Sequence, residues 1–211
     1  MNYDRCPNCG KSLNGFLSSD LLVKSKIDFI NKYSEQSNDA YCTSCSKPLL
    51  NKIAQHFKKQ KKEIENRLEQ IIHYIPVVTS PAPVKWDYEM IGMVTAQTTS
   101  GTGFATELSR QFNDFFGTTS NTTNQKIARA TNLCKADLRV QCVRQGGNAI
   151  ISTDIDFNEI GSGSTNMLMV CMAGTAIRVT DMTNFSIKSR DTIIEIIELT
   201  EQLEAIAEMN I

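Results

Sequence analysis

Two apolar runs in the second half of the chain place the strongest constraint on the fold. Residues 148–157 and 166–179 are rich in β-branched and sulfur-containing side chains. Between them stands the turn sequence Gly161-Ser162-Gly163-Ser164. Apolar runs of this length around a glycine-rich turn predict two adjacent strands, joined by a loop of more than two residues.

The residues before this hairpin predict one more strand and two helices. Residues 85–97 have the composition of a strand, whereas residues 104–116 and 124–145 carry apolar side chains at helical spacing on one face. The loop between the two helices is polar. The predicted order is therefore β-α-α-β-β, which is an α+β fold.

The remaining sequence divides the chain into five segments. Net positive charge lies in residues 1–83 and net negative charge in residues 84–211, which supports a chain of two parts. Pro76, Pro81 and Pro83 favour extended backbone and remove amide donors, so we expect a semi-rigid spacer rather than packed structure. The predicted segments are a cysteine-bearing module over 1–48, an amphipathic linker helix over 49–75, the spacer over 76–83, the α+β domain over 84–180 and a C-terminal helix over 187–211.

The linker helix has two interpretations. Leu50, Phe57, Ile64 and Ile71 recur every seven residues, which is the spacing of a coiled-coil seam. An amphipathic helix that packs on its own domain would show the same stripe. The C-terminal helix carries a similar apolar stripe, with Ser189 or Asp191 as the expected N-cap.

Two Cys-x-x-Cys pairs carry the most specific chemical signal. Cys6, Cys9, Cys42 and Cys45 can present four thiolates to one ion, and zinc is the expected metal. A site with four cysteines leaves no position for water or substrate, so the expected role is structural. A thioredoxin-like redox pair would need a βαβ context, which this sequence lacks.

Cysteine usage and hydropathy also bear on the compartment. An odd number of cysteines, four of them in metal-type pairs, fits a reducing environment better than a disulfide framework. The chain shows neither a secretory signal nor a run of eighteen apolar residues. We therefore expect a cytoplasmic protein with no transmembrane segment.

A lysine cluster in the linker helix raises nucleic acid or a membrane surface as partners. Lys58, Lys59, Lys61 and Lys62 follow the cysteine module closely, and zinc ribbons often touch nucleic acid. No aromatic residue interleaves these lysines, however, and such a charge run is also typical of a solvated helix face.

The α+β domain contains several separated motifs, which are Ile91-Gly92-Met93-Val94-Thr95, Gly101, Gly146, Ala149-Ile150, Asp154-Ile155-Asp156-Phe157, Gly161, Met167-Leu168-Met169-Val170 and Gly174-Thr175-Ala176. Together these motifs resemble the YbjQ family, whose members carry a heavy-metal-binding label and no established reaction. The resemblance implies a small α+β subunit that forms a ring, a homopentamer, with strands of neighbouring subunits pairing. A three-stranded sheet leaves edges that such assembly would close.

The family label directs attention to two rows of side chains in the hairpin. Alternation places Met167, Met169 and Cys171 on one strand face, where sulfur ligands would suit a thiophilic ion. Met and free Cys are also ordinary core residues. Cys134 and Cys142 are not carried over as family ligands.

The second row is acidic. Asp154 and Asp156 share one side of their strand and Glu159 follows, which would suit a hard cation, a solvent face or contacts between subunits. No histidine, nucleophile or phosphate loop accompanies these carboxylates, and neither His56 nor His73 is placed as a catalytic base.

Together these features predict a non-enzymatic homo-oligomer that displays zinc-ribbon modules on a YbjQ-like ring, with a binding or scaffold role. Its partners would be other copies of itself and a protein bound through the zinc module. The alternatives are a metal-handling protein, which needs a second exchangeable metal site, and a binder of nucleic acid or membrane surfaces through the basic helix.

Overall fold

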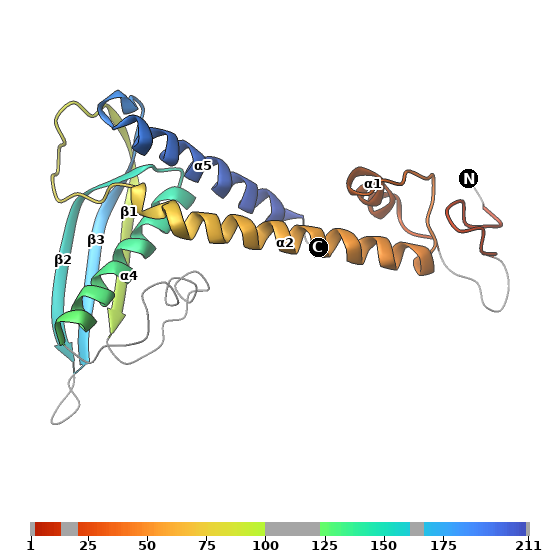
Figure 1. Ribbon diagram of the computed structural model, residues 1–211, viewed down its shortest axis with the longest axis horizontal. Coiled ribbons are helices and arrows are strands. Elements are labelled where there is room, and N and C mark those ends of the chain that lie inside the picture. The colour runs from red at the N-terminus through yellow and green to blue at the C-terminus, as the bar shows by residue number, and fades with distance from the viewer. Residues whose placement is uncertain (1–2, 14–20, 100–122, 161–166, 210–211) are drawn as a thin grey trace. The chain divides into compact units, whose positions relative to one another are not determined.

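A computed structural model describes residues 3–13, 21–99, 123–160 and 167–209 of the chain (Figure 1). The chain divides into two compact units. Unit 1 comprises Met1–Glu63 and Glu208–Ile211, and unit 2 comprises Ile64–Ala207. The boundary after Glu63 falls within one helix, α2 (Thr43–Ile71).

Unit 1 contains α1 (Lys24–Tyr33) and most of α2. Its fully buried side chains include Ile30 and Tyr41, and the ring of Tyr33 meets that of Phe57 edge-on at 5.1 Å. The helix α2 begins within the second cysteine pair, six residues before the predicted linker helix, so that Pro48 lies inside it. Proline within the first two turns removes one helical hydrogen bond, and here the preceding turn is held by the Ser46 amide, which donates to the Cys42 carbonyl at 3.0 Å.

Unit 2 is built on a three-stranded antiparallel sheet with strand order β1-β3-β2. Its strands are β1 (Tyr88–Thr99), β2 (Ala149–Ile160) and β3 (Met167–Val179). The pair β2 and β3 is the hairpin that the apolar runs predict, and β3 is central because β1 pairs with its other side. The sheet and its helices confirm the α+β class.

The helix α4 (Thr123–Arg144) lies across one face of the sheet (Figure 1). Alternate residues of β3, such as Val170, Met172 and Ala176, point toward α4 and are buried. The same core takes in the 3-10 turn η1 (Ile72–Tyr74), which follows α2, and α5 (Ile187–Glu208). The buried linker-helix residues Ile53, Phe57, Ile64 and Ile71 are covered within a single chain, which favours the amphipathic interpretation over an open coiled-coil seam.

Two predicted features lie outside the described residues. They are the helix over 104–116 and the hairpin loop over 161–164.

The proline-rich segment is packed on the sheet, which corrects the prediction of a spacer without packed structure. Val77 forms a parallel bridge with Ile150 at the outer edge of β2. The Val78 amide donates to the Ile150 carbonyl and the Ile150 amide to the Pro76 carbonyl, each at 2.9 Å. The extended backbone that proline favours is also strand geometry, so the residues between the prolines can add an edge to β2.

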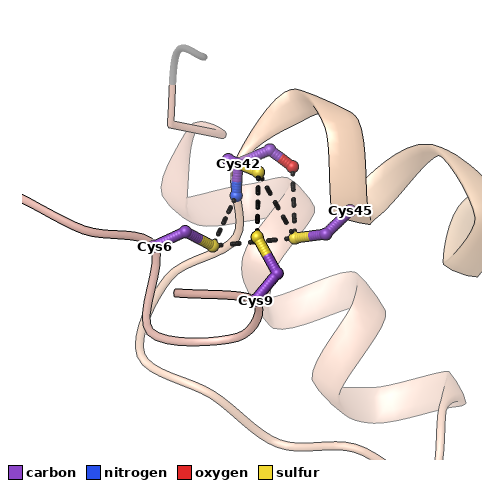
Figure 2. Close-up of side chains that lie close together, drawn as sticks. All are labelled: Cys6, Cys9, Cys42 and Cys45. Atoms are coloured by element: carbon purple, nitrogen blue, oxygen red, sulfur yellow. Dashed lines mark hydrogen bonds between the residues drawn. The ribbon is translucent and has the colours of Figure 1, made fainter. Parts of the chain in front are cut away.

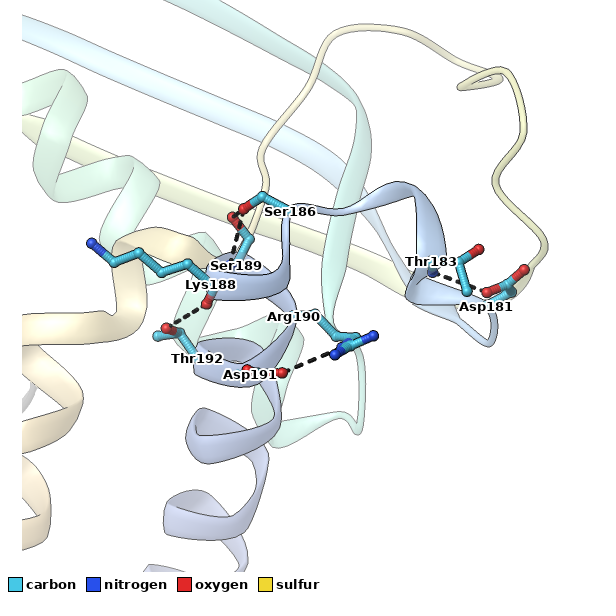
Figure 3. A network of polar contacts seen from close by, with 8 residues as sticks. All are labelled: Asp181, Thr183, Ser186, Lys188, Ser189, Arg190, Asp191 and Thr192. Atoms are coloured by element: carbon cyan, nitrogen blue, oxygen red, sulfur yellow. Dashed lines mark hydrogen bonds and ion pairs between the residues drawn. The ribbon is translucent and has the colours of Figure 1, made fainter.

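A cap at Ser186 starts α5 (Figure 3). The Ser189 amide donates to the Ser186 Oγ at 3.1 Å, which is the bond of an N-cap to the third helical residue. Just before it, the Asp181 carboxylate accepts from the Thr183 amide at the 3-10 turn η2 (Met182–Asn184). The prediction of Ser189 or Asp191 as the cap was therefore wrong, because the helix begins earlier than the apolar stripe suggests.

Candidate metal centre

The first Cys-x-x-Cys pair lies on a tight turn in unit 1. The Gly10 amide donates to the Cys6 carbonyl and the Cys6 amide to the Lys11 carbonyl, both at 2.8 Å. Gly10 has a φ of 69°, a left-handed conformation that glycine adopts without strain. This turn directs both thiols to one side.

The second pair lies at the beginning of α2. Cys42 immediately precedes the helix and Cys45 belongs to its first turn, so a rise of about one turn brings their sulfurs within 3.5 Å of each other. Cys42 is also held by an isolated bridge to Leu21, on the segment before α1.

The four sulfurs form one cluster (Figure 2). They lie within 4.8 Å of one another, and Cys6 to Cys45 and Cys9 to Cys42 are both 3.6 Å apart. A tetrahedral zinc ion with Zn–S bonds of about 2.3 Å places its sulfurs about 3.8 Å apart. The arrangement therefore fits one tetrahedral thiophilic ion and is compatible with a zinc-ribbon-like module.

Backbone hydrogen bonds to the cysteine sulfurs favour the thiolate form that binds a cation. Burial raises the pKa of Cys6, but hydrogen bonds from the backbone of Cys9, Cys42 and Asn8 outweigh it and lower that pKa to about 6. The Cys42 amide reaches the Cys6 sulfur at 3.2 Å. By contrast, burial raises the pKa of Cys45 to about 12, and the sulfurs of Cys42 and Cys6 act in the same direction. Because zinc is held by thiolates, the thiols of the cluster that are protonated lose their protons when the ion binds.

A polar network that sequence analysis missed supports the cluster from the side of α1. The Asn38 amide group donates to the Asn8 Oδ1 at 3.0 Å, and Asn8 lies between the two cysteines of the first pair. Asn31 accepts from the Asn38 backbone amide at 3.1 Å and from the Tyr41 hydroxyl at 2.6 Å. Asparagine at these positions has no sequence signal of its own, because the residues converge only after the chain folds.

The sulfur and acidic rows meet on the face of the sheet opposite α4. In the strand register Asp156 lies across from Cys171, and Asn158 lies across from Met169. Asp154 and Asp156 are exposed, while Met169 and Cys171 are half-buried. Glu159 and Met167 take the register positions opposite Leu168 and Ile160. The Asn158 amide group donates to the Asp156 carboxylate at 2.9 Å, so these two side chains lie on the same side of β2.

Among its described side chains, this sheet face has no ligand cluster of the kind found in unit 1. Within the described parts of the chain, the four cysteines are the one group of three or more His, Cys, Asp or Glu side chains with ligand atoms close enough for a shared ion.

Cys134 and Cys142 belong to the covered face and not to any ligand cluster. Their sulfurs contact the Val170 carbonyl at 3.5 Å and the Ala149 carbonyl at 3.3 Å. Burial raises the pKa of each thiol to about 12, so both are neutral core side chains at physiological pH.

The predicted polyanion contacts lie on the exposed side of α2. Lys58, Lys59, Lys61 and Lys62 are all exposed, and Lys59 pairs with Glu63 at 3.7 Å. His56 and His73 are exposed as well. Across the helices that the structure describes, none is both long and apolar enough to cross a bilayer.

The second half of the chain is similar to known proteins. Residues 75–180 match a family model, YbjQ, described as "Putative heavy-metal-binding". A UPF0145 protein of Clostridium botulinum (strain Alaska E43 / Type E3) is 31% identical over 102 residues, which are 48% of this chain and 95% of that protein. A UPF0145 protein of Acetivibrio thermocellus is 33% identical over 89 residues, which are 42% of this chain and 83% of that protein.

Among solved structures, the chain is similar to a protein of unknown function from Pediococcus pentosaceus ATCC 25745, described as a member of the DUF74 family. The TM-score is 0.34 and the sequence identity 17%, over 49% of this chain and 95% of that one. The family match begins at residue 75, so the proline-rich segment that pairs with β2 lies inside it, whereas the four-cysteine cluster lies outside it. Because the match spans half of the chain and includes all three strands, this protein belongs to the YbjQ family.

Proposed function

We propose that this protein is a non-enzymatic homo-oligomer that displays zinc-loaded modules on a ring of YbjQ-type domains and has a binding or scaffold role. The observation that carries the proposal is the convergence of four thiols from two distant pairs in a chain whose other half is a YbjQ domain.

Zinc is the proposed metal because the donor set consists of four thiolates in tetrahedral spacing. Zinc has no geometric preference of its own and is commonly held by four cysteines in structural sites. Such a closed site supplies folding free energy rather than a reaction centre, since no coordination position stays open for water or substrate.

The outer edge of β2 supports assembly, whereas the edge of β1 is partly covered. On β1, the Gln141 amide group donates to the Thr95 carbonyl at 2.7 Å and accepts from the Thr95 amide at 3.3 Å, so α4 occupies part of that edge. On β2, the proline-rich segment pairs only with the first residues, through Thr153. The second half of β2 would then be the edge that a neighbouring subunit extends. We propose a homopentamer, in keeping with the family resemblance.

Native mass spectrometry of the untagged protein, purified without chelator, tests both parts of the proposal. We expect five chains and one zinc ion per chain. A monomer would contradict the ring, and a chain that retains no zinc would contradict the display of zinc modules. The Cys9→Ser, Cys45→Ser double variant is the control, because it should lose the metal and keep the oligomeric state.

A metal-handling role is the second candidate, and the juxtaposition of Asp156 and Cys171 across β2 and β3 favours it. It requires an exchangeable ion in addition to the zinc. Equilibrium dialysis with Cu(I) should then give a second ion per chain that Cys171→Ser removes. Saturation at one ion per chain would contradict this role.

A further inference from the structure

We propose that one exposed side of α2 binds the phosphate backbone of a nucleic acid. We call this side the donor strip, and it consists of five residues. They are Lys47, Asn51, Gln55, Lys58 and Lys62.

The donor strip is continuous because its residues follow helical spacing. Intervals of four, four, three and four residues keep side chains on one face of an α-helix. All five are exposed, and the fifteen steps from Lys47 to Lys62 cover about 22 Å at a rise of 1.5 Å per residue. The whole strip lies within unit 1.

Every side chain of the strip can donate a hydrogen bond to a phosphate oxygen. Lys supplies a charged donor, and the amide groups of Asn and Gln commonly contact the phosphate backbone in protein–nucleic acid complexes. Among the described residues, Lys47, Lys58 and Lys62 make no ion pair, so their charges are available to a ligand.

The stretch of α2 from Thr43 to Lys62 contains no Asp or Glu, and Lys52, Lys59 and Lys61 are exposed on it. Glu63 follows directly and pairs with Lys59 at 3.7 Å, so the positive stretch ends there. Residues 1–63 contain eleven Lys and Arg and six Asp and Glu. A zinc ion with four thiolates adds two negative charges at the cysteine cluster, which still leaves this part of the chain positive. The second half is acidic, so attraction of a polyanion is confined to unit 1.

The burial of α2 favours nucleic acid over a membrane surface. A helix that binds a bilayer inserts an apolar face between the headgroups. The apolar side of α2 is already covered by the protein, since Ile53, Phe57 and Ile64 are at most 8% exposed. Val23 is the one large apolar side chain that unit 1 exposes within its described residues. A row of phosphates needs only the cations and donors of the strip.

Recognition by the strip is independent of base sequence. It contains no aromatic side chain for base stacking and no arginine for bidentate contacts to guanine. The binding free energy then comes from release of counterions, and affinity falls steeply as salt increases.

Fluorescence anisotropy with the zinc-loaded full-length protein tests the proposal. The probe is a fluorescein-labelled DNA duplex of about 20 base pairs, titrated at several KCl concentrations between about 50 and 200 mM. We expect Lys58→Gln with Lys62→Gln to weaken binding at least about tenfold at the lowest salt. The same variant should reduce the slope of log K against log[KCl] by about 2, because each phosphate contact contributes about 0.9.

The matched control is Lys24→Gln with Lys26→Gln, which removes two exposed charges from α1 in the same unit. We expect this control to change affinity by less than about threefold, because its lysines lie off the strip. Equal losses in the two variants would overturn the proposal, since they would reflect net charge alone. It would also be overturned if the wild-type protein left the duplex unbound at the lowest salt, or if it bound only vesicles of phosphatidylcholine with phosphatidylglycerol.

Discussion

Gly147 lies at the corner between α4 and β2, where a side chain has no room. A Cβ there would lie 2.7 Å from the Cys142 sulfur, 3.0 Å from the Cys142 carbonyl and 3.1 Å from the Ile177 carbonyl. Two of these three atoms belong to the backbone and cannot turn aside. We expect Gly147→Ala to lower the free energy of unfolding by about 1 to 3 kcal/mol.

Urea denaturation followed by the fluorescence of Trp86 measures this effect, since Trp86 is the single tryptophan and lies in unit 2. The matched control is Gly92→Ala, whose Cβ would meet only the Gln145 side chain at 3.4 Å. We expect that control to stay within about 1 kcal/mol of wild type, because alanine is no worse than glycine in a strand. A similar loss in both variants would contradict the steric explanation.

The folding stability of unit 2 should depend on pH through Asp137. Burial raises the pKa of this half-buried carboxyl, although Gln141 and Arg144 act against the shift. A raised pKa in the folded state means that folding favours the protonated acid. Its contribution is therefore most favourable below the ordinary pKa of 3.8 and is lost as the pH rises through the folded value.

We expect Asp137→Asn to stabilise unit 2 at pH 7 and to make little difference near the ordinary carboxyl pKa. The gain should be less than about 1 kcal/mol, because partial exposure leaves the charge hydrated on one side. Urea midpoints from Trp86 fluorescence across this pH range measure it. A variant less stable than wild type at pH 7 would show that the charge itself is needed.

At the scale of elements, packing rather than ion pairing holds α5 in unit 2. Ile193 and Ile196 are fully buried in the main core. Arg67 on α2 contacts the Glu195 carboxylate through two bonds of 2.6 and 2.9 Å, but both side chains are more than a third exposed. Exposed ion pairs stabilise little, so we assign the docking of α5 to its isoleucines.

Paired isoleucine variants on α5 test this assignment. Ile196→Ala should lower the free energy of unfolding by about 2 to 5 kcal/mol, because it leaves a cavity in the core. Ile194, two residues earlier, is 40% exposed, and Ile194→Ala should cost less than about 1 kcal/mol. The comparison uses the same helix and the same change of side chain, with urea denaturation as the measurement. Equal losses of unfolding free energy in the two variants would show that burial of the Ile196 side chain does not hold α5 in unit 2.

For the whole molecule, the two units should depend differently on metal. Unit 1 is a small fold whose two cysteine pairs lie in one cluster, and structural zinc in such folds contributes about 10 kcal/mol or more. Unit 2 has a core of its own. We expect a strong zinc chelator to collapse the amide NMR signals of residues 3–63 and to leave the Trp86 signal of unit 2 unchanged.

The Cys9→Ser, Cys45→Ser variant should reproduce this collapse without chelator, which separates loss of metal from any effect of the reagent. Dispersed signals from unit 1 after complete chelation would contradict a structural role for the ion.

Patterns carried by neighbouring residues were predictable from the sequence. The hairpin of β2 and β3 follows from two apolar runs around a turn, and the exposed lysines of α2 follow from a polar helix face. Each Cys-x-x-Cys pair is a local turn whose two thiols point the same way. These features depend on residues a few positions apart, where backbone geometry links sequence to shape directly.

Features that join distant residues required the tertiary structure. The prolines by themselves predict a spacer, because they do not reveal that Val77 pairs with Ile150 some seventy residues later. Asn31 and Asn38 carry no sequence signal either, because their hydrogen bonds to Tyr41 and Asn8 form only when α1 lies beside the cysteine turn.

By itself, then, the sequence determined the two cysteine pairs, the strands and the family. Only the tertiary structure decided that the two cysteine pairs share one tetrahedron, that Asp156 faces Cys171, and that Cys134 is sealed in the core while Cys171 is not. The physical reason is that strand register and helix docking are chosen by the burial of whole faces, and no single segment encodes that choice.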